Sequence, residues 1–385
     1  MARIRKFEVF AVDLPLKRTF KQIGDERSVS DSIFVKCITD TDTSGFGECL
    51  PREHVTGETR QYSYELLRDS ILPHLVGKDF NSFEDVRQFL FRCDGKAPSL
   101  FPDSHLPQNA SWCAAELALL DTFGHEFNES LFSHIDDRAK SRHRYSGVVF
   151  ADSGIKFFST SMKMLVLGFP AVKLKVTKKV ELDAIKQLRN LLGSNVDIRV
   201  DPDITWDLPT AITMIREMAK QGVHCFEQPL VKDDIEGLAK LVSETGESIM
   251  ADESFTDRQS LQNLIAQNAC TAVNVKISKC GGLIASQRLI LEALSAGLMV
   301  QVGCNIGESS LLSAAHLALI TQFSEIKYCE GCFGAHMLKD DPVEPQVQFR
   351  YGGRLPQVPD QRHGLGVTVN EELLRRYTTQ FDDVS

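Results

Sequence analysis

The sequence lacks several features that would place it in other protein classes. Its 43 lysines and arginines are outnumbered by 52 aspartates and glutamates, so the net charge is -9 and no basic surface for a nucleic acid is expected. No run reaches the length of about 18 apolar residues that a membrane-spanning helix needs. The N-terminal segment MARIRKFEVFAVDL carries acidic residues inside its apolar run and no small-residue cleavage site, so we expect no signal peptide. These absences exclude nucleic-acid and membrane partners and favour a globular protein.

A cysteine spacing typical of disulfide-rich proteins is also missing. The ten cysteines are scattered, and several lie inside apolar runs. Cys329 and Cys332 form one Cys-x-x-Cys pair, but a single pair is weak evidence for a redox or zinc site. We interpret both residues as packing or pocket-wall residues. Reduced thiols of this kind are typical of the cytoplasm, where we expect this protein.

The middle of the chain contains strand-like segments that end in charged residues at a regular spacing. The steps from Asp201 to Glu227, to Asp252 and to Lys276 are 26, 25 and 24 residues. A short strand, a helix of about 10–12 residues and two loops fill such a step. Alternating strands and helices predict a closed (β/α)8 barrel of about 250 residues, in which chemistry occurs at the C-terminal ends of the strands. The charged residues that we expect there are Lys173, Lys175, Asp201, Glu227, Asp252 and Lys276.

The remaining length predicts further units around this barrel. Residues 1–130 contain three strand-like segments and then three helix-like segments, so we expect an α+β capping domain there. The barrel is expected over 131–340, and a Pro- and Gly-rich segment, 341–385, is expected to return to the cap. The eight barrel strands are predicted at 145–150, 171–176, 197–201, 223–227, 248–251, 272–277, 298–302 and 326–330.

Three carboxylates on neighbouring strands predict a metal site. Asp201, Glu227 and Asp252 would end strands three, four and five, and three such charges repel one another unless a cation lies among them. Ligation by oxygen alone selects a hard divalent ion, so we expect Mg²⁺, with Mn²⁺ as the alternative.

Lysines on both sides of that metal site indicate the chemistry. Lys173 and Lys175 are two residues apart on strand two and therefore point to the same side of the sheet. Lys276 ends strand six, on the other side of the metal site. A substrate carboxylate between them would have one lysine at each face of its α-carbon. Lys175 and Lys276 are the expected acid and base, with a pKa lowered to about 7–8 by nearby cations and burial, and Lys173 is a cationic neighbour. The metal would stabilise the resulting enediolate.

The ordered motifs resemble the enolase superfamily, in its muconate-lactonising subgroup. The matching stretches are KLK at 173–175, VDPD at 200–203, FEQP at 226–229, ADES at 251–254 and NVKISKCGG at 274–282. The resemblance spans nearly the whole chain and implies a modified TIM barrel with an N-terminal cap, Mg²⁺, and abstraction of a proton α to a carboxylate. It therefore predicts a metal-dependent isomerase that acts on a small carboxylate.

The resemblance leaves the overall reaction open between two alternatives. The cap segments PLKRTF and VTGET are similar to those of dipeptide epimerases, which favours a racemase or epimerase of a dipeptide or N-acylamino acid. Dipeptide epimerases usually carry Asp-x-Asp after strand eight, however, and this chain has YCEGCFGAHMLKDD there. That departure favours a cycloisomerase or a dehydratase. A smaller departure is Asp203, where the family often has asparagine.

Residues farther from the metal are predicted with less support from the pattern. Arg52 in a cap loop, Glu308 after strand seven and Glu330 after strand eight are expected to contact substrate. Lys279 lies close to Lys276, but it precedes two glycines and is interpreted as a loop residue without a role. A lysine Schiff-base aldolase would explain Lys276 but none of the carboxylates. A homo-oligomer is expected, as is common for barrel enzymes.

Overall fold

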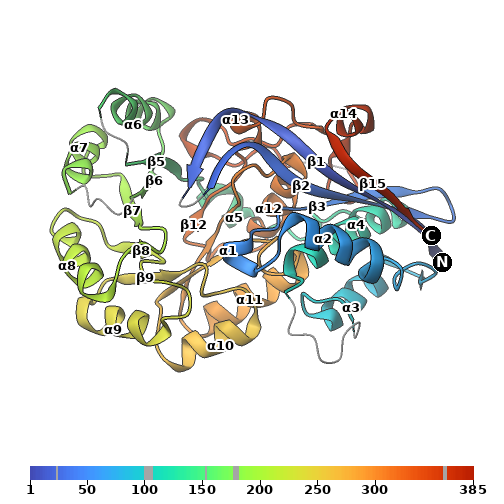
Figure 1. Ribbon diagram of the computed structural model, residues 1–385, viewed down its shortest axis with the longest axis horizontal. Coiled ribbons are helices and arrows are strands. Elements are labelled where there is room, and N and C mark those ends of the chain that lie inside the picture. The colour runs from blue at the N-terminus through green and yellow to red at the C-terminus, as the bar shows by residue number, and fades with distance from the viewer. Residues whose placement is uncertain (23–24, 99–106, 152–153, 177–181, 359–361) are drawn as a thin grey trace.

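The first strands of the chain form an antiparallel sheet that extends far beyond the cap. The computed structural model describes residues 1–22, 25–98, 107–151, 154–176, 182–358 and 362–385 (Figure 1). Strands β1 (Ala2–Gln22), β2 (Asp25–Thr39) and β3 (Ser44–Cys49) pair in that order, which confirms the predicted meander. The β1–β2 ribbon is long enough to reach the segment after β12, where Leu16 pairs with Leu338.

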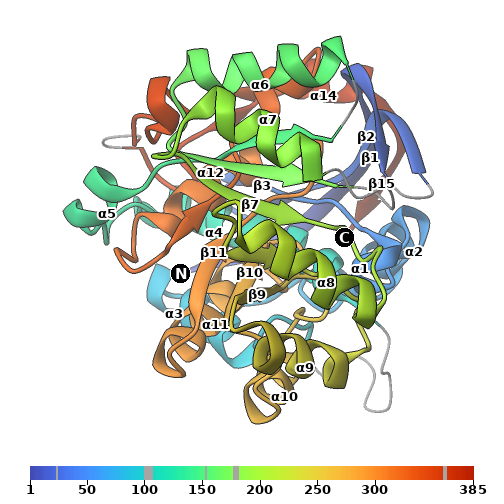
Figure 2. The same ribbon diagram turned by 90° about the vertical axis from the view of Figure 1, so that its left-hand side faces the viewer.

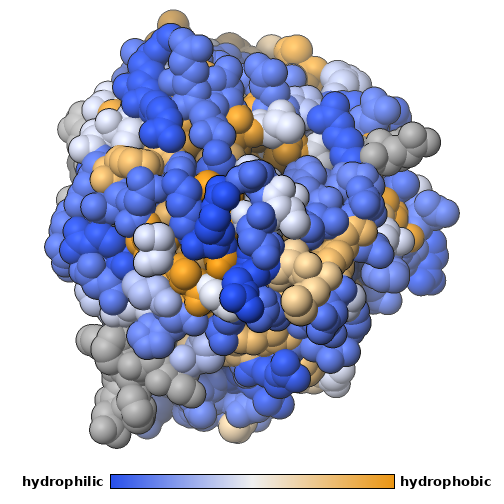
Figure 3. Space-filling view, turned by 90° about the vertical axis from the view of Figure 1, so that its right-hand side faces the viewer, coloured by the Kyte–Doolittle hydropathy of each residue, from blue (hydrophilic) through white to orange (hydrophobic). Residues whose placement is uncertain are grey.

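Helices cover one face of this sheet and complete the cap. Helix α4, apolar around most of its circumference, is buried against β3, where Gly45 and Gly47 allow the close approach; a Cβ at Gly47 would lie 2.0 Å from the Ala114 carbonyl oxygen. The outer surface of the cap side is mostly hydrophilic, with small scattered apolar patches (Figure 3). The cap elements after β3 are α1 (Glu53–Thr56), α2 (Arg60–Leu66), the π-helical turn η1 (Leu67–Ile71), β4 (Asp79–Phe80), α3 (Phe83–Cys93) and α4 (Asn109–Phe127).

Eight parallel strands in chain order form the barrel, as the spacing predicted. They are β5 (Gly147–Phe150), β6 (Ala171–Lys175), β7 (Asp197–Asp201), β8 (Cys225–Glu227), β9 (Ser248–Ala251), β10 (Ala272–Val275), β11 (Met299–Val302) and β12 (Tyr328–Cys329). A parallel bridge between Tyr145 and Cys329 joins the last strand to the first and closes the ring. The (β/α)8 fold with a cap is thereby confirmed.

Helices alternate with these strands and lie on the outside of the sheet (Figure 2). Helix α5 (Asp137–Arg142) precedes β5. The others are α6 (Ile155–Leu167), α7 (Leu182–Leu192), α8 (Leu208–Ala219), α9 (Ile235–Thr245), α10 (Arg258–Ala266), α11 (Leu283–Ser295) and α12 (Ser310–Ile320). Within the described ranges no helix is both long and apolar enough to cross a bilayer.

The segment after β12 runs back to the cap. It contains α13 (Gly334–Met337), β13 (Val343–Glu344), the 3-10 turn η2 (Tyr351–Gly353), β14 (Thr368–Val369), α14 (Glu371–Arg376) and β15 (Thr378–Val384). Strand β15 pairs antiparallel with β1: Val384 lies opposite Phe7, and Phe381 lies opposite Phe10. The chain therefore begins and ends in one sheet. All ten cysteines are free, and most are buried.

Two buried glutamates of the cap bind the N-termini of barrel helices. Glu116 on α4 accepts a hydrogen bond from the Ile284 amide at the start of α11 (2.9 Å). Glu48 on β3 accepts hydrogen bonds from the Ser309 and Leu312 amides at the start of α12 (3.2 and 3.3 Å). Such amides have no partner within their own helix, so each carboxyl group holds the cap to the barrel.

Burial makes this interface sensitive to pH. It raises the pKa of Glu116 from 4.5 to about 8, against the effect of its amide donors. The folded protein then holds a proton that the unfolded chain releases near pH 4.5, so the contribution to stability is complete below that pH and is lost as pH rises through about 8. We expect Glu116→Gln to flatten the fall in unfolding free energy between about pH 5 and pH 8. Denaturant titrations across that range, with exposed Glu236→Gln as the control, measure the slope; an unchanged slope in Glu116→Gln would contradict the assignment.

Candidate active site

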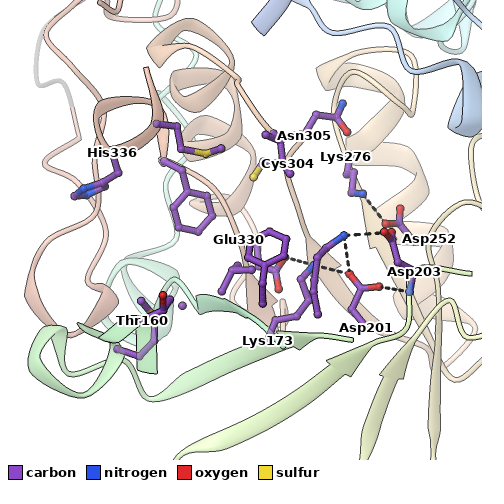
Figure 4. Close-up of a pocket in the computed structure, with 18 of the residues that line it drawn as sticks. Thr160, Lys173, Asp201, Asp203, Asp252, Lys276, Cys304, Asn305, Glu330 and His336 are labelled. Carbon is purple, nitrogen blue, oxygen red and sulfur yellow. Dashed lines mark hydrogen bonds and ion pairs between the residues drawn. The ribbon is translucent and has the colours of Figure 1, made fainter. Parts of the chain in front are cut away.

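The charged residues predicted from the spacing converge at one end of the barrel. They line a cavity of about 410 Å³ between the C-terminal ends of the strands and the cap (Figure 4). Lys173, Lys175, Asp201, Asp252 and Lys276 are all in its lining, and the cap contributes Lys17, Arg18, Arg52, His54 and Val55. Glu227 is not part of this lining, but its Oε1 lies 3.2 Å from Lys173 Nζ. The parallel order of the strands places the charged residues of the barrel at one end of it, as the spacing predicts.

Lys173 is the centre of the buried charge network. Its ammonium nitrogen lies 2.6 Å from Glu330 Oε2, 3.2 Å from Glu227 Oε1 and 3.4 Å from Asp201 Oδ2. Burial lowers the pKa of Lys173, but the three facing carboxylates outweigh it and keep that pKa well above its ordinary value. Lys173 is therefore a permanent cation in this arrangement and is suited to holding an anionic substrate group.

Lys175 and Lys276 approach the carboxylates from opposite sides of the cavity. Lys175 Nζ lies 3.3 Å from Asp201 Oδ2 and 3.2 Å from Asp203 Oδ1, and Lys276 Nζ lies 2.5 Å from Asp252 Oδ2. Burial lowers the pKa of each lysine, but the adjacent carboxylates raise it above its ordinary value overall. The sequence predicts a lowered pKa for both lysines. That lowering requires a cation that first neutralises these carboxylates.

The three predicted metal ligands are buried and held in place from below. Asp201, Glu227 and Asp252 are at most 4% exposed. Asn274 Nδ2 on β10 and Gln301 Nε2 on β11 donate to the two Glu227 oxygens at 2.9 and 3.2 Å. Burial raises the pKa of Glu227 to about 7, although Lys173 opposes this, whereas Lys276 and Lys279 hold the pKa of Asp252 well below its usual range against burial.

The donor set fits a divalent cation, although the lysines at present bridge the carboxylates. Among the described residues no three candidate ligands converge closely enough to enclose an ion, because ammonium groups lie against Asp201, Glu227 and Asp252. Buried carboxylates require a positive partner, and the lysines provide it here. The oxygen-only chemistry of the three groups is the chemistry that Mg²⁺ or Mn²⁺ prefers.

The sequence context of Lys279 indicated a loop residue, but its side chain also belongs to this charge network. It does lie in the turn after β10, but its side chain is 2% exposed. Its ammonium group donates to Asp252 Oδ1, to the Asp252 carbonyl and to the Asn274 carbonyl, each at 2.7 Å. The signal in the sequence was the Lys-x-x-Lys spacing of Lys276 and Lys279. The Cys280 amide donates to the Lys276 carbonyl and closes a helix-like turn, and in such a turn residues three apart lie on the same side.

Arg199 was not singled out from the sequence, and in the structure it is a partner of Glu330. Arg199 on β7 is 1% exposed inside the barrel, and its guanidinium lies 4.0 Å from the centre of the Tyr328 ring. Its Nη2 donates to Glu330 Oε1 at 2.8 Å, while Lys173 contacts Glu330 Oε2. Both oxygens of Glu330 are thus engaged by cations, which hold its pKa below the ordinary value despite burial. The expected contact of Glu330 with substrate remains a prediction.

We expect Glu330→Gln to destabilise the fold by about 1–3 kcal/mol, because a neutral amide leaves one of two buried cations without its acceptor. The free energy of unfolding measures this. Exposed Glu325→Gln is the matched control and should change stability by less than about 0.5 kcal/mol. Equal stability of the two variants would show that Arg199 and Lys173 do not depend on this carboxylate.

Two other residues expected to meet substrate have contacts within the protein. Arg52 is 5% exposed; its guanidinium donates to Asp31 Oδ1 at 3.0 Å and to the Ile306 carbonyl at 3.0 Å, and so connects the cap to the loop after β11. It also lines the cavity. Glu308 accepts a hydrogen bond from the Asn305 amide at 2.6 Å in that same loop. Substrate contact by either residue remains a prediction.

Comparisons with known proteins agree with this geometry. Residues 159–373, more than half of the chain, match the family model described as "Enolase C-terminal domain-like". The chain is 27% identical over 386 residues to N-succinyl-L-Arg/Lys racemase of Bacillus cereus, covering 99% of both chains. It is 28% identical to L-Ala-D/L-Glu epimerase of Bacillus subtilis, covering 95% of this chain and 96% of the relative.

Solved structures show the same architecture over the whole chain. The crystal structure of the Bacillus cereus racemase superposes with a TM-score of 0.86 at 26% identity and covers 100% of both chains. A dipeptide epimerase from Cytophaga hutchinsonii, complexed with Mg and the dipeptide D-Ala-L-Val, has a TM-score of 0.84 at 22% identity with the same coverage. At that identity the second likeness establishes the fold alone.

Proposed function

Because this chain is an isomerase of the enolase superfamily, we propose that it is a racemase or epimerase of a dipeptide or N-acylamino acid and moves the proton on the carbon α to a carboxylate. One observation carries the proposal: Lys175 and Lys276 enter the cavity from strands on opposite sides of the carboxylate cluster. Inversion at a carbon atom requires a proton acceptor on one face and a donor on the other, and this pair supplies both. The names of the relatives support the same reaction class.

The residues of the chain divide the work of proton transfer. Lys173 lies where it can hold the substrate carboxylate by its charge. In one direction Lys175 accepts the α-proton and Lys276 donates a proton to the opposite face; in the other direction the roles reverse. Asp201, Glu227 and Asp252 would hold a divalent ion, and Mg²⁺ in the crystal structure of the Cytophaga hutchinsonii relative supports that choice. When bound, such an ion supplies Lewis-acid stabilisation of the negative charge on the substrate carboxylate.

A cycloisomerase or dehydratase on the same scaffold is the second candidate. It needs one lysine for proton transfer and the other only as a cation. The observation that favours it lies after β12, where Glu330 is engaged by Lys173 and Arg199 and no Asp-x-Asp pair follows. A free substrate ammonium therefore has no carboxylate pair in that position.

Deuterium uptake in D2O tests the proposal. We would incubate the protein and Mg²⁺ with pools of dipeptides, N-acylamino acids and small diacid lactones, and measure mass and product identity. Metal-dependent uptake at an α-carbon together with formation of the epimer is expected. A lactone or an alkene as product would favour the second candidate instead, and no uptake from any pool would contradict α-proton transfer on these substrates.

A further inference from the structure

The cavity has a charged floor and, opposite it, an apolar wall that proton transfer does not use. The floor consists of the lysines and carboxylates described above. On the side of Thr160 and His336, across the cavity from Asp252 and Lys276, aromatic and thioether side chains line the cavity (Figure 4). The residues of this apolar wall are Phe150, Met164, Leu167, Phe169, Phe333, Met337 and Phe349.

Aromatic contacts hold this wall in a fixed arrangement. The Phe349 ring packs edge-on against Phe169 and Phe333, with ring centres 5.1 and 5.8 Å apart, and stacks on His336 at 4.8 Å. Phe169 is buried, whereas Phe333 and Phe349 are only partly buried and expose ring surface. Rings ordered before a ligand arrives offer apolar contact at low entropic cost.

The charges around the wall are cationic. Lys163 lies on α6 beside Met164, and Lys17 and Arg18 come from β1, where Lys17 donates to the Ala335 carbonyl of α13 at 2.5 Å. In contrast, all acidic residues in the described lining belong to the floor: Asp201, Asp203, Asp252, Glu253 and Glu330. A ligand group at the wall therefore meets apolar surface and positive charge, and among the described lining residues a cationic side chain there would meet no carboxylate.

We propose that the substrate of this chain carries a bulky neutral apolar group, aromatic by preference, which occupies the apolar wall while its carboxylate lies on the floor. The inference rests on the proposed function and narrows its substrate class. It also separates this chain from the Bacillus cereus relative, whose name specifies arginine and lysine derivatives. Burial of an apolar group in such a wall would favour a substrate that carries the group over an otherwise identical substrate that lacks it.

The test compares matched substrates in the deuterium-exchange assay with Mg²⁺. N-acetylphenylalanine and N-acetyllysine are compared with N-acetylalanine, and N-benzoylalanine is included so that the apolar group can also sit on the nitrogen. We expect kcat/KM for the better aromatic substrate to exceed the values for N-acetylalanine and N-acetyllysine by about 10–100-fold. Preference for N-acetyllysine, or no preference for an aromatic group in either position, would overturn the inference.

Variants of Phe349 connect the preference to the wall. Phe349→Ala should reduce the aromatic-to-alanine ratio of kcat/KM at least about tenfold, and Phe349→Leu, which keeps an apolar side chain, should reduce it less. Phe91→Ala, at an exposed position on α3 outside the cavity, is the matched control and should leave the ratio unchanged. A ratio that stays the same in folded Phe349→Ala would contradict the role of the wall.

Calorimetric binding of the same substrates distinguishes failure of the substrate inference from failure of the proposed function. Tighter binding of the aromatic substrate to the wild type than to Phe349→Ala, without exchange, would support the inference and overturn the proposed function. Exchange of N-acetylalanine without any aromatic preference would support the proposed function and overturn the inference.

Discussion

Lys175→Ala and Lys276→Ala are each expected to lower α-proton exchange by about 10²–10⁴-fold, and each for a different enantiomer of the substrate. On the proposed function, the two side chains would reach the substrate from opposite sides, so each would accept the proton from only one face. Exchange into D2O, followed separately for the L and D substrates by mass spectrometry, measures the effect. Full activity in either variant would contradict two-base transfer, and equal loss for both enantiomers in both variants would favour a single proton carrier.

This experiment needs a variant that shows the loss to be local. Lys240→Ala removes an exposed lysine from α9, on the outside of the barrel, and should leave exchange unchanged for both enantiomers. Circular dichroism of all three variants separates loss of chemistry from loss of fold. The control matters because both lysines also pair with buried carboxylates.

Lys279→Met is expected to lower the free energy of unfolding by about 3–5 kcal/mol, the largest effect on stability in this site. The change leaves two backbone carbonyls and the buried Asp252 carboxylate without a donor that now lies 2.7 Å from each. Denaturant-induced unfolding measures the loss. Because methionine has a similar length, packing is largely retained and the effect reports on the lost charge and hydrogen bonds.

The matched control for Lys279→Met is Lys220→Met at the end of α8. Lys220 has a side chain that is 68% exposed and pairs only with Glu217 on the surface, so its loss should change stability by less than about 0.5 kcal/mol. If both variants were equally stable, the buried position of Lys279 would not matter. A loss in Lys279→Met that mutation of Asp252 to asparagine reduces would confirm that the pair is the cause.

The barrel could be predicted from sequence because one physical rule repeats along it. Each βα unit needs nearly the same number of residues, and chemistry requires charged residues at the same strand end. Hence the order Asp201, Glu227, Asp252 and Lys276 was enough to place side chains that the structure brings together: three of them line one cavity, and Glu227 contacts Lys173 of the same lining. The meander of the cap followed from alternation of apolar and polar residues in the same way.

The remaining features depend on contacts between distant parts of the chain. Whether Glu330 faces a ligand or a neighbour depends on which strands meet when the ring closes, and there it meets Arg199 and Lys173. Lys279 lies in a turn, as expected, but its place in the charge network was missed because the direction of a side chain in a turn is set by the backbone conformation. The apolar wall depends on Phe349, which the return segment brings to the cavity from beyond β12. No local sequence pattern encodes such contacts between distant residues.

The pairing of β15 with β1 has a consequence for the order in which the protein can mature on the ribosome. Phe7 is synthesised long before its partner Val384, which follows the entire barrel. The edge of β1 therefore stays open until translation has passed all eight barrel strands, and contacts so distant in sequence form slowly. Since loops of the cap contribute to the cavity, the barrel is expected to be present before the enclosed cavity is, and the nascent chain becomes competent only late.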